Sequence, residues 1–195
     1  MSKSWNQARL AEVLKRDALK TGVFTLASGR TSHYYVDGRL VTLSAEGSEL
    51  IALGVLKVLE AYPEVQAIGG LTMGADPIVG ATLGLASQCG RPNLLGFLVR
   101  KEAKAHGTGK RVEGPLKPGM AVAIVDDVAT SGGSSLQAVD AVEAAGAKVA
   151  VVIAALDRLE GAARAFEARG LAFRSLMTIR DLGVEPLPPL ADDNT

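Results

Sequence analysis

The sequence predicts an α/β fold in which helices flank a central parallel sheet. Five short apolar runs follow one another between residues 65 and 177, and stretches with helical spacing separate them. Short continuous apolar runs are typical of strands buried on both faces, and strands that alternate with helices form βαβ units. The 195 residues fit one domain that buries roughly 70% of its unfolded surface. We therefore expect a single domain over residues 1–195.

The expected elements follow in order along the chain. Apolar positions at helical spacing predict helices over residues 4–19 and 45–61. Residues 24–37 are polar and rich in turn formers, which indicates a loop and a short strand. The five expected strands are 65–71, 94–99, 120–125, 149–156 and 171–177. Further helices are expected at 132–145, at 160–169 and at 76–87, where Asp76 would be the N-cap before Pro77.

Composition and charge exclude several classes of protein. The 21 Lys and Arg residues balance 21 Asp and Glu residues, so nothing in the net charge favours binding to nucleic acid or to an anionic membrane. The single cysteine, Cys89, excludes a disulfide framework and a cysteine-built metal site. Residues 1–16 are basic without an apolar run, and no stretch is long and apolar enough to span a membrane, so we expect a cytoplasmic protein. Any anionic ligand must be bound by a local arrangement.

Residues 122–135, VAIVDDVATSGGSS, are the most informative segment. An apolar strand leads into Asp126 and Asp127, and a Thr/Ser/Gly loop then opens a helix. A glycine-containing turn at a helix N-terminus presents free backbone N–H groups, which suit a phosphate. The preceding carboxylates accept hydrogen bonds and suit vicinal sugar hydroxyls, so the segment predicts a site for a ribose 5-phosphate. The alternative is a plain strand-to-helix turn; a glycosidase pair is disfavoured because adjacent residues do not flank a bond from opposite faces.

Residues 98–109, LVRKEAKAHGTG, form a second cluster. Arg100, Lys101, Lys104 and His106 concentrate positive charge in a neutral chain, and glycines follow. A cationic loop that closes over an anion can stabilise charge on a leaving group. The alternative is a solvated charged loop.

These segments resemble a known family. Residues 122–135 resemble the phosphoribosyl pyrophosphate signature of type I phosphoribosyltransferases, and the pattern R-K-x-x-K-x-H-G resembles the catalytic loop of orotate phosphoribosyltransferases. Three further stretches are similar to the same family: FTLASGRTSHYYVD at 24–37, GGLTMGADP at 69–77 and ALDR at 155–158. The adjacent tyrosines Tyr34 and Tyr35 also suggest stacking on a planar base, with core packing as the alternative. A guanidinium such as that of Arg158 can bind a carboxylate bidentately.

The resemblance implies a type I phosphoribosyltransferase fold with an N-terminal hood at about 1–45, an α/β core at about 46–185 and a tail at 186–195. It implies transfer of ribose 5-phosphate from phosphoribosyl pyrophosphate to orotate in pyrimidine biosynthesis, by a homodimer that shares the catalytic loop between subunits, with Mg²⁺ bound mainly through the substrate and no dedicated protein metal site. Catalysis would fall to Lys104, Arg100, Lys101, His106 and Asp127. Phosphoribosyl pyrophosphate would contact Asp126, Asp127, Val128, Ala129, Thr130, Ser131, Gly132, Gly133, Ser134, Met73 and Gly74. Orotate would contact Tyr34, Tyr35, Thr130 and Arg158.

The sequence departs from several family members at Ala27 and at Gly74-Ala75, where those members carry lysine. The other functions considered are transfer to a purine or to uracil, and a non-catalytic regulator that senses phosphoribosyl pyrophosphate. A phosphatase with Asp126 as nucleophile is disfavoured, because position 128 is valine instead of a second aspartate.

Overall fold

The computed structural model of the chain describes residues 4–25, 29, 31–102 and 111–187. In this part the strands form a six-stranded sheet in the order β5-β4-β3-β6-β7-β8 and a separate hairpin of β1 and β2. The five long strands of the larger sheet pair in parallel, whereas β5 pairs antiparallel with β4 at the edge. The sheet strands are β3 (Ala67–Leu71), β4 (Leu95–Val99), β5 (Val112–Glu113), β6 (Ala121–Ala129), β7 (Lys148–Asp157) and β8 (Phe173–Thr178).

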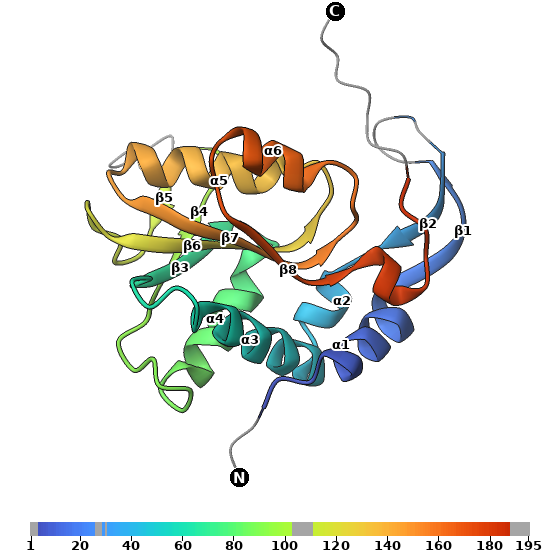
Figure 1. Cartoon of the computed structure of the whole chain (residues 1–195), viewed down its shortest axis with the longest axis horizontal. Coiled ribbons are helices and arrows are strands. Elements are labelled where there is room, and N and C mark those ends of the chain that lie inside the picture. Colours follow the sequence, from blue (N-terminus) through green and yellow to red (C-terminus); the bar gives the residue numbers. More distant parts are fainter. Residues whose placement is uncertain (1–3, 26–28, 30, 103–110, 188–195) are drawn as a thin grey trace, which may run out of the picture.

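Helices cover both faces of this sheet (Figure 1). α3 (Ala45–Leu59) and α4 (Ala75–Ala86) lie on one face, and α5 (Gly133–Ala144) and α6 (Ala162–Ala168) on the other. Each face has its own apolar cluster: Ile51, Ile78 and Ile153 belong to the first, Phe97 and Phe166 to the second. The central strands are buried on both sides, which is why they read as continuous apolar runs.

The segment before α3 forms a small cap at one end of the sheet (Figure 1). It contains α1 (Gln7–Val13), a π-helical turn η1 (Leu14–Ala18), the hairpin strands β1 (Leu19–Thr25) and β2 (Thr31–Val36), and α2 (Arg39–Thr42). Leu10, Val13 and Leu14 join the apolar cluster beneath α3, and a short 3₁₀ helix η2 (Ile179–Leu182) follows β8 against them. Apolar burial therefore attaches this segment to the rest of the domain.

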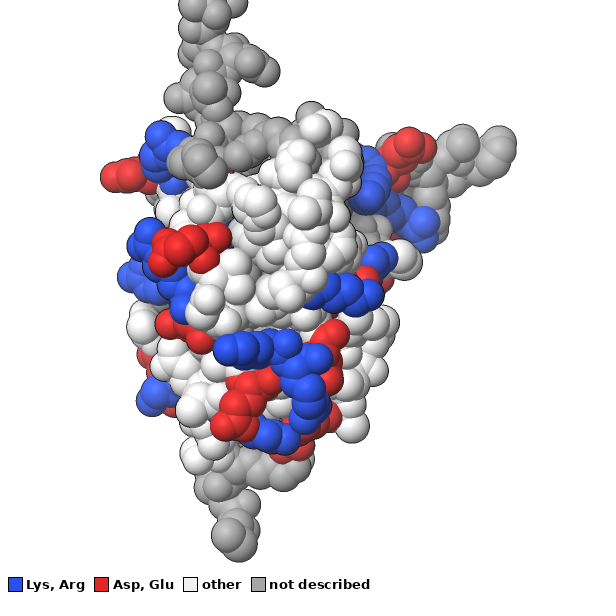
Figure 2. Space-filling view, turned by 90° about the vertical axis from the view of Figure 1, so that its right-hand side faces the viewer, with Lys and Arg blue, Asp and Glu red and all other residues white. Residues whose placement is uncertain are grey.

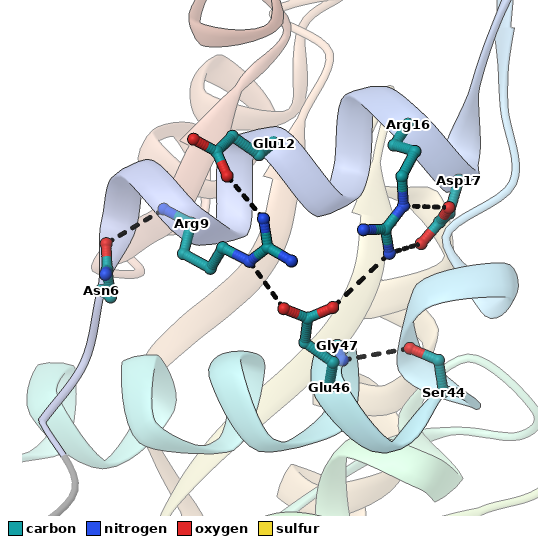
Figure 3. Close-up of polar contacts among 8 residues, drawn as sticks. All are labelled: Asn6, Arg9, Glu12, Arg16, Asp17, Ser44, Glu46 and Gly47. Atoms are coloured by element: carbon teal, nitrogen blue, oxygen red, sulfur yellow. Dashed lines mark hydrogen bonds and ion pairs between the residues drawn. The ribbon is translucent and has the colours of Figure 1, made fainter.

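Ion pairs add contacts at the surface of the same junction (Figure 3). The carboxylate of Glu46, on α3, accepts from Arg9 Nε at 2.6 Å and lies 3.5 Å from Arg16 Nη2, both on the α1 side. These side chains are exposed, so water screens their attraction and they contribute little to stability. On the face drawn in Figure 2, acidic and basic side chains lie next to one another and do not form a patch of one charge.

The structure confirms the predicted fold class and the order of the predicted strands and helices. Three details differ. α4 begins at Ala75 after Gly74, so Asp76 lies in its first turn and is not the N-cap. β6 continues through both aspartates to Ala129, because β7 pairs with it as far as Asp157. The structure also has a regular hairpin at 19–36 where the sequence indicated a loop and a short strand.

No helix among the described residues is long and apolar enough to cross a membrane.

Candidate active site

The carboxyl ends of β3, β6 and β7 meet at one edge of the sheet, and several of the predicted site residues lie there, among them Asp126, Asp127 and Gly74. Asp126 is 8% exposed near the end of β6, and its Oδ2 accepts a hydrogen bond of 2.8 Å from Ser135 Oγ on the first turn of α5. Its Oδ1 accepts from the backbone N–H of Asp127 at 3.1 Å. The Asp127 side chain turns back onto the following residue, since its Oδ1 accepts from the Val128 N–H at 2.9 Å.

The burial of Asp126 has an electrostatic consequence. Loss of water around the carboxylate, together with the nearby charge of Asp127, raises the pKa of Asp126 to about 7. The hydrogen bond from Ser135 acts in the opposite direction because it stabilises the charged form. The pair therefore holds less negative charge near neutral pH than two exposed aspartates would.

The loop after β6 forms a small cradle. Gly132 has φ +86°, a left-handed conformation that favours glycine, and α5 begins at the next residue. The first backbone N–H groups of a helix have no partner within it, so they are available to an anion. A cavity of about 80 Å³ lies against this turn, lined by Asp126, Val128, Ala129, Thr130, Ser131, Gly132, Gly133 and Ser134.

A second cavity of about 260 Å³ shares part of the same lining. It is bordered by Arg39, Leu71, Thr72, Met73, Gly74, Lys101, Asp126, Asp127, Val128 and Ser134. Two glycines allow the backbone to approach Asp127 closely: a Cβ at Gly74 would lie 2.7 Å from Asp127 Oδ1, and one at Gly38 would lie 2.9 Å from Oδ2. The predicted residues Met73, Gly74 and Lys101 are thus brought to the two aspartates.

The predicted cationic loop is described only at its two ends. Arg100 N–H donates to the carbonyl of Arg111 at 2.8 Å, which continues the β4–β5 pairing. The Arg100 side chain donates from Nε to Glu113 Oε1 at 3.0 Å, and Arg100 does not line either site cavity. Lys104 and His106, both predicted as catalytic, lie outside the described residues.

Arg158 follows β7 in a tight turn. Asp157 Oδ1 accepts from the backbone N–H of Leu159 at 2.8 Å, and Leu159 has φ +59°. The Arg158 side chain is 7% exposed, with its guanidinium carbon 5.0 Å from the centre of the Tyr34 ring. Its Nη2 lies 2.7 Å from Glu160 Oε1, yet neither Nε nor Nη2 has a well-aligned hydrogen-bond acceptor among the described residues.

The two predicted tyrosines do not share a face. Side chains alternate along β2, so Tyr34 is 1% exposed whereas Tyr35 is 37% exposed. The Tyr34 hydroxyl donates to Glu160 Oε1 at 2.8 Å, and burial raises its pKa. Tyr35 lies beside Phe24, with 5.9 Å between ring centres. Tyr34 therefore packs in the core, which is the alternative considered, and Tyr35 stays a prediction for stacking on a base.

Several further residues lie at the site although the sequence did not point to them. From the N-terminal cap, Gly38 approaches Asp127 closely and Arg39 lines the same cavity as Asp127. Glu160 pairs with Arg158, and Ser135 donates a hydrogen bond to Asp126. Only the short pattern Asp37-Gly38-Arg39 could have drawn attention to the cap, because a glycine followed by a cation suggests a close approach. A cavity of about 550 Å³ between α5 and the residues around β5 is lined by none of the predicted residues.

Comparison with known proteins gives a consistent picture. No model of a known protein family matches the chain. It is 48% identical over 184 residues to an orotate phosphoribosyltransferase of Rhodopirellula baltica (92% of this chain, 95% of that one) and 42% identical over 180 residues to that of Mycobacterium tuberculosis (92% and 98%).

Solved structures agree. A Mycobacterium tuberculosis orotate phosphoribosyltransferase crystallised with Fe(III) dicitrate superposes with a TM-score of 0.81 at 42% identity, covering 91% of this chain and 99% of that one. Another crystal of that protein, in complex with 5-phospho-α-D-ribosyl 1-diphosphate, gives 0.76 at 37% identity over 91% and 99%. An adenine phosphoribosyltransferase of Leishmania donovani, at 20% identity and a TM-score of 0.61, shares the fold over 98% of this chain and 89% of that one. The chain belongs to the orotate phosphoribosyltransferase family.

Proposed function

We propose that this protein transfers the ribose 5-phosphate group of phosphoribosyl pyrophosphate to N1 of orotate, which gives orotidine 5′-monophosphate and pyrophosphate in pyrimidine biosynthesis. One observation carries the proposal beyond family membership. A single stretch from Asp126 to Ser134 borders two adjoining cavities, one with carboxylates and cations and one with helix N–H groups and hydroxyls. A sugar with hydroxyls, a 5-phosphate and a charged leaving group needs both.

The substrate sugar would bind across this stretch. Asp127, and Asp126 behind it, would accept hydrogen bonds from the ribose hydroxyls, and their charge would lie near the cation that develops at the anomeric carbon. Residues 129–134 would hold the 5-phosphate with the first N–H groups of α5 and with the hydroxyls of Thr130, Ser131 and Ser134. These roles use groups that the turn already presents in one place.

Orotate would bind at the end of β7. The buried guanidinium of Arg158 has N–H groups without aligned acceptors, and a planar carboxylate is the acceptor that such a group fits. Glu160 and Tyr34 would position Arg158, because one is paired with it and the other lies beneath it. Tyr35 stays the candidate for stacking on the base. We propose that Thr130 contributes a hydroxyl, since the Arg158 N–H donates to the carbonyl of the neighbouring Ala129 at 2.9 Å.

The leaving pyrophosphate would be stabilised by cations. Lys101 borders the larger cavity, and we propose Lys104, with Arg100 and His106, as the further cations of the loop. Mg²⁺, when bound, would neutralise part of the charge of the pyrophosphate and polarise the bond to the sugar. Asp127 offers a carboxylate at the cavity edge, but no group of three His, Cys, Asp or Glu side chains among residues 4–25, 29, 31–102 and 111–187 could hold a metal alone. This donor set fits an ion bound mainly through substrate oxygens.

We also propose that the active unit is a homodimer whose subunits exchange the cationic loop. Large apolar side chains are exposed on segments around the larger cavity: Leu40 and Leu43 on and after α2, and Met73 in its lining. Exposed apolar groups around a site are typical of surfaces that a partner covers. Lys104→Ala and Asp127→Asn chains, each inactive, should regain activity when mixed; no recovery despite subunit exchange would show that each loop serves its own chain.

The reaction itself is tested with a panel of bases. The protein is incubated with phosphoribosyl pyrophosphate, Mg²⁺ and orotate, uracil, adenine or hypoxanthine, and both pyrophosphate and nucleotide are measured. We expect turnover with orotate and little with the other bases. We also propose that the protein works in the cytoplasm. Faster turnover with a purine or uracil would favour a transferase for another base, and tight binding without turnover would favour a sensing protein.

A further inference from the structure

One further cation, Arg39, borders the site cavity of about 260 Å³. Arg39 is the first residue of α2, and it lines the cavity together with Lys101, Gly74 and both aspartates. Its neighbour Gly38 lies against Asp127, where even a Cβ would come within 2.9 Å of Oδ2. The positive charge of Arg39 is correspondingly influenced by Asp127, which contributes to the raised pKa of its guanidinium.

A second residue holds the Arg39 side chain in place. Arg39 Nε donates to Asp37 Oδ1 at 2.8 Å, and Nη2 donates to Oδ2 at 3.0 Å. This two-point contact fixes the plane of the guanidinium. It also lowers the pKa of Asp37, so this carboxylate stays charged to a lower pH than an unpaired one. Nη1 has no hydrogen-bond partner among the described residues, so it can donate to a ligand.

The charges around the cavity indicate what that ligand is. Asp126 and Asp127 repel an anion, and neither Gly74 nor its neighbour Ala75 carries a charge. A diphosphate therefore needs other cations on this side, and Lys101 and Arg39 are the two that line the cavity among the described residues. Planar guanidinium groups bind phosphate oxygens well because they donate from two atoms in one plane.

We propose that Arg39 is a substrate-binding residue for the diphosphate of phosphoribosyl pyrophosphate, and that Asp37 is its positioning residue. The proposal rests on the proposed function for the identity of the ligand. The N-terminal cap would then bind directly the part of the substrate that leaves as pyrophosphate.

Direct binding tests the role of Arg39 without requiring turnover. Calorimetric titration with phosphoribosyl pyrophosphate, and separately with inorganic pyrophosphate, compares wild type with Arg39→Gln. Loss of a charged hydrogen-bond donor should lower the binding affinity for both ligands roughly tenfold to hundredfold. Arg39→Lys keeps the charge but lacks the planar guanidinium, so its affinity should lie between those of wild type and Arg39→Gln. Arg169→Gln is the matched control. Like Arg39, Arg169 is an exposed arginine that donates to carboxylates, in this case those of Asp140 and Glu143 on α5. It does not line the cavity.

Kinetics separate Arg39 from the orotate site. Arg39→Gln should raise KM for phosphoribosyl pyrophosphate and leave KM for orotate unchanged. Asp37→Asn, which keeps shape but loses charge, should raise the same KM by a smaller factor, and the double variant should be no worse than Arg39→Gln alone. Unchanged binding of both ligands in Arg39→Gln, or a raised KM for orotate only, would overturn the proposal.

The two proposals fail differently. If wild type binds phosphoribosyl pyrophosphate and Arg39→Gln does not, while orotate is not turned over, then the proposed reaction is wrong and the assignment of Arg39 stands. If orotate is turned over and Arg39→Gln binds as wild type does, then only the assignment of Arg39 is wrong.

Discussion

Replacement of Asp126 by asparagine should change how the stability of the protein depends on pH. The buried carboxyl keeps its proton up to about pH 7 in the folded chain, whereas in the unfolded chain it loses the proton near its ordinary pKa of 3.8. Between these values the folded state binds more protons than the unfolded state, so stability contributed by this group is complete below the unfolded pKa and falls as the pH rises through the folded pKa. The asparagine variant has no such loss.

The size of the effect follows from the shift. A rise from 3.8 to about 7 is roughly three pKa units, which corresponds to about 4 kcal/mol at 1.36 kcal/mol for each unit. This is an upper value, because part of the shift comes from Asp127, whose charge can rearrange. The free energy of unfolding of Asp126→Asn, relative to wild type, should therefore increase by up to about 4 kcal/mol between about pH 4 and pH 8.

Urea denaturation across this pH range measures the difference, in the absence of substrate and Mg²⁺. Ser135→Ala is the companion variant: its hydroxyl stabilises the charged carboxylate, so its loss should raise the pKa of Asp126 further. A difference between Asp126→Asn and wild type that stays constant with pH would refute the reasoning, as would a carbon-13 titration of the Asp126 carboxyl with its midpoint near the ordinary value.

Three other variants test close packing and hydrogen bonding, two at the site and one away from it. Gly74→Ala places a methyl group 2.7 Å from Asp127 Oδ1, so it should cost roughly 1–3 kcal/mol and raise KM for phosphoribosyl pyrophosphate, as thermal unfolding and initial rates would show. Tyr34→Phe removes the hydrogen bond to a buried carboxylate, so it should cost about 1–2 kcal/mol and raise KM for orotate alone in steady-state kinetics. Arg91→Met removes a guanidinium that donates to the carbonyls of three residues around the end of α3, and urea denaturation should show a loss of roughly 2–4 kcal/mol with both KM values unchanged.

The first variant has a matched control, and the second has an outcome that would contradict it. Gly84 lies inside α4, the helix that follows Gly74, and a Cβ added there would have no atom within 4 Å, so Gly84→Ala should gain roughly 1 kcal/mol through helix propensity. Equal effects of the two alanines would contradict the close approach to Asp127. A Tyr34→Phe variant that weakens phosphoribosyl pyrophosphate instead of orotate would contradict the role of Tyr34 under Arg158.

The sequence predicted the sheet well because its strands are buried on both faces. The runs at 94–99 and 149–156 are apolar throughout, and 65–71 is apolar except for Gln66. Runs this short favour strands over helices, which are usually longer. The hairpin at 19–36 was harder, since one face of β2 is exposed and the segment is rich in polar residues. β5 has only two residues and is defined by its pairing with β4, so no local pattern could indicate it.

For the site, the sequence by itself determined what lies in one continuous stretch. Asp126 to Ser134 leads from a strand into a helix, so local geometry alone brings carboxylates, hydroxyls and N–H groups together. Only the tertiary structure decided which distant residues join them. Tyr34 contacts Glu160 across 126 positions of the chain. Gly38 of the cap and Gly74 after β3 both approach Asp127, and Arg39 of the cap lines the same cavity. Contacts of this kind depend on which elements pack together, and a neighbouring pair such as Tyr34 and Tyr35 can be separated by the same pleat that brings distant residues into contact.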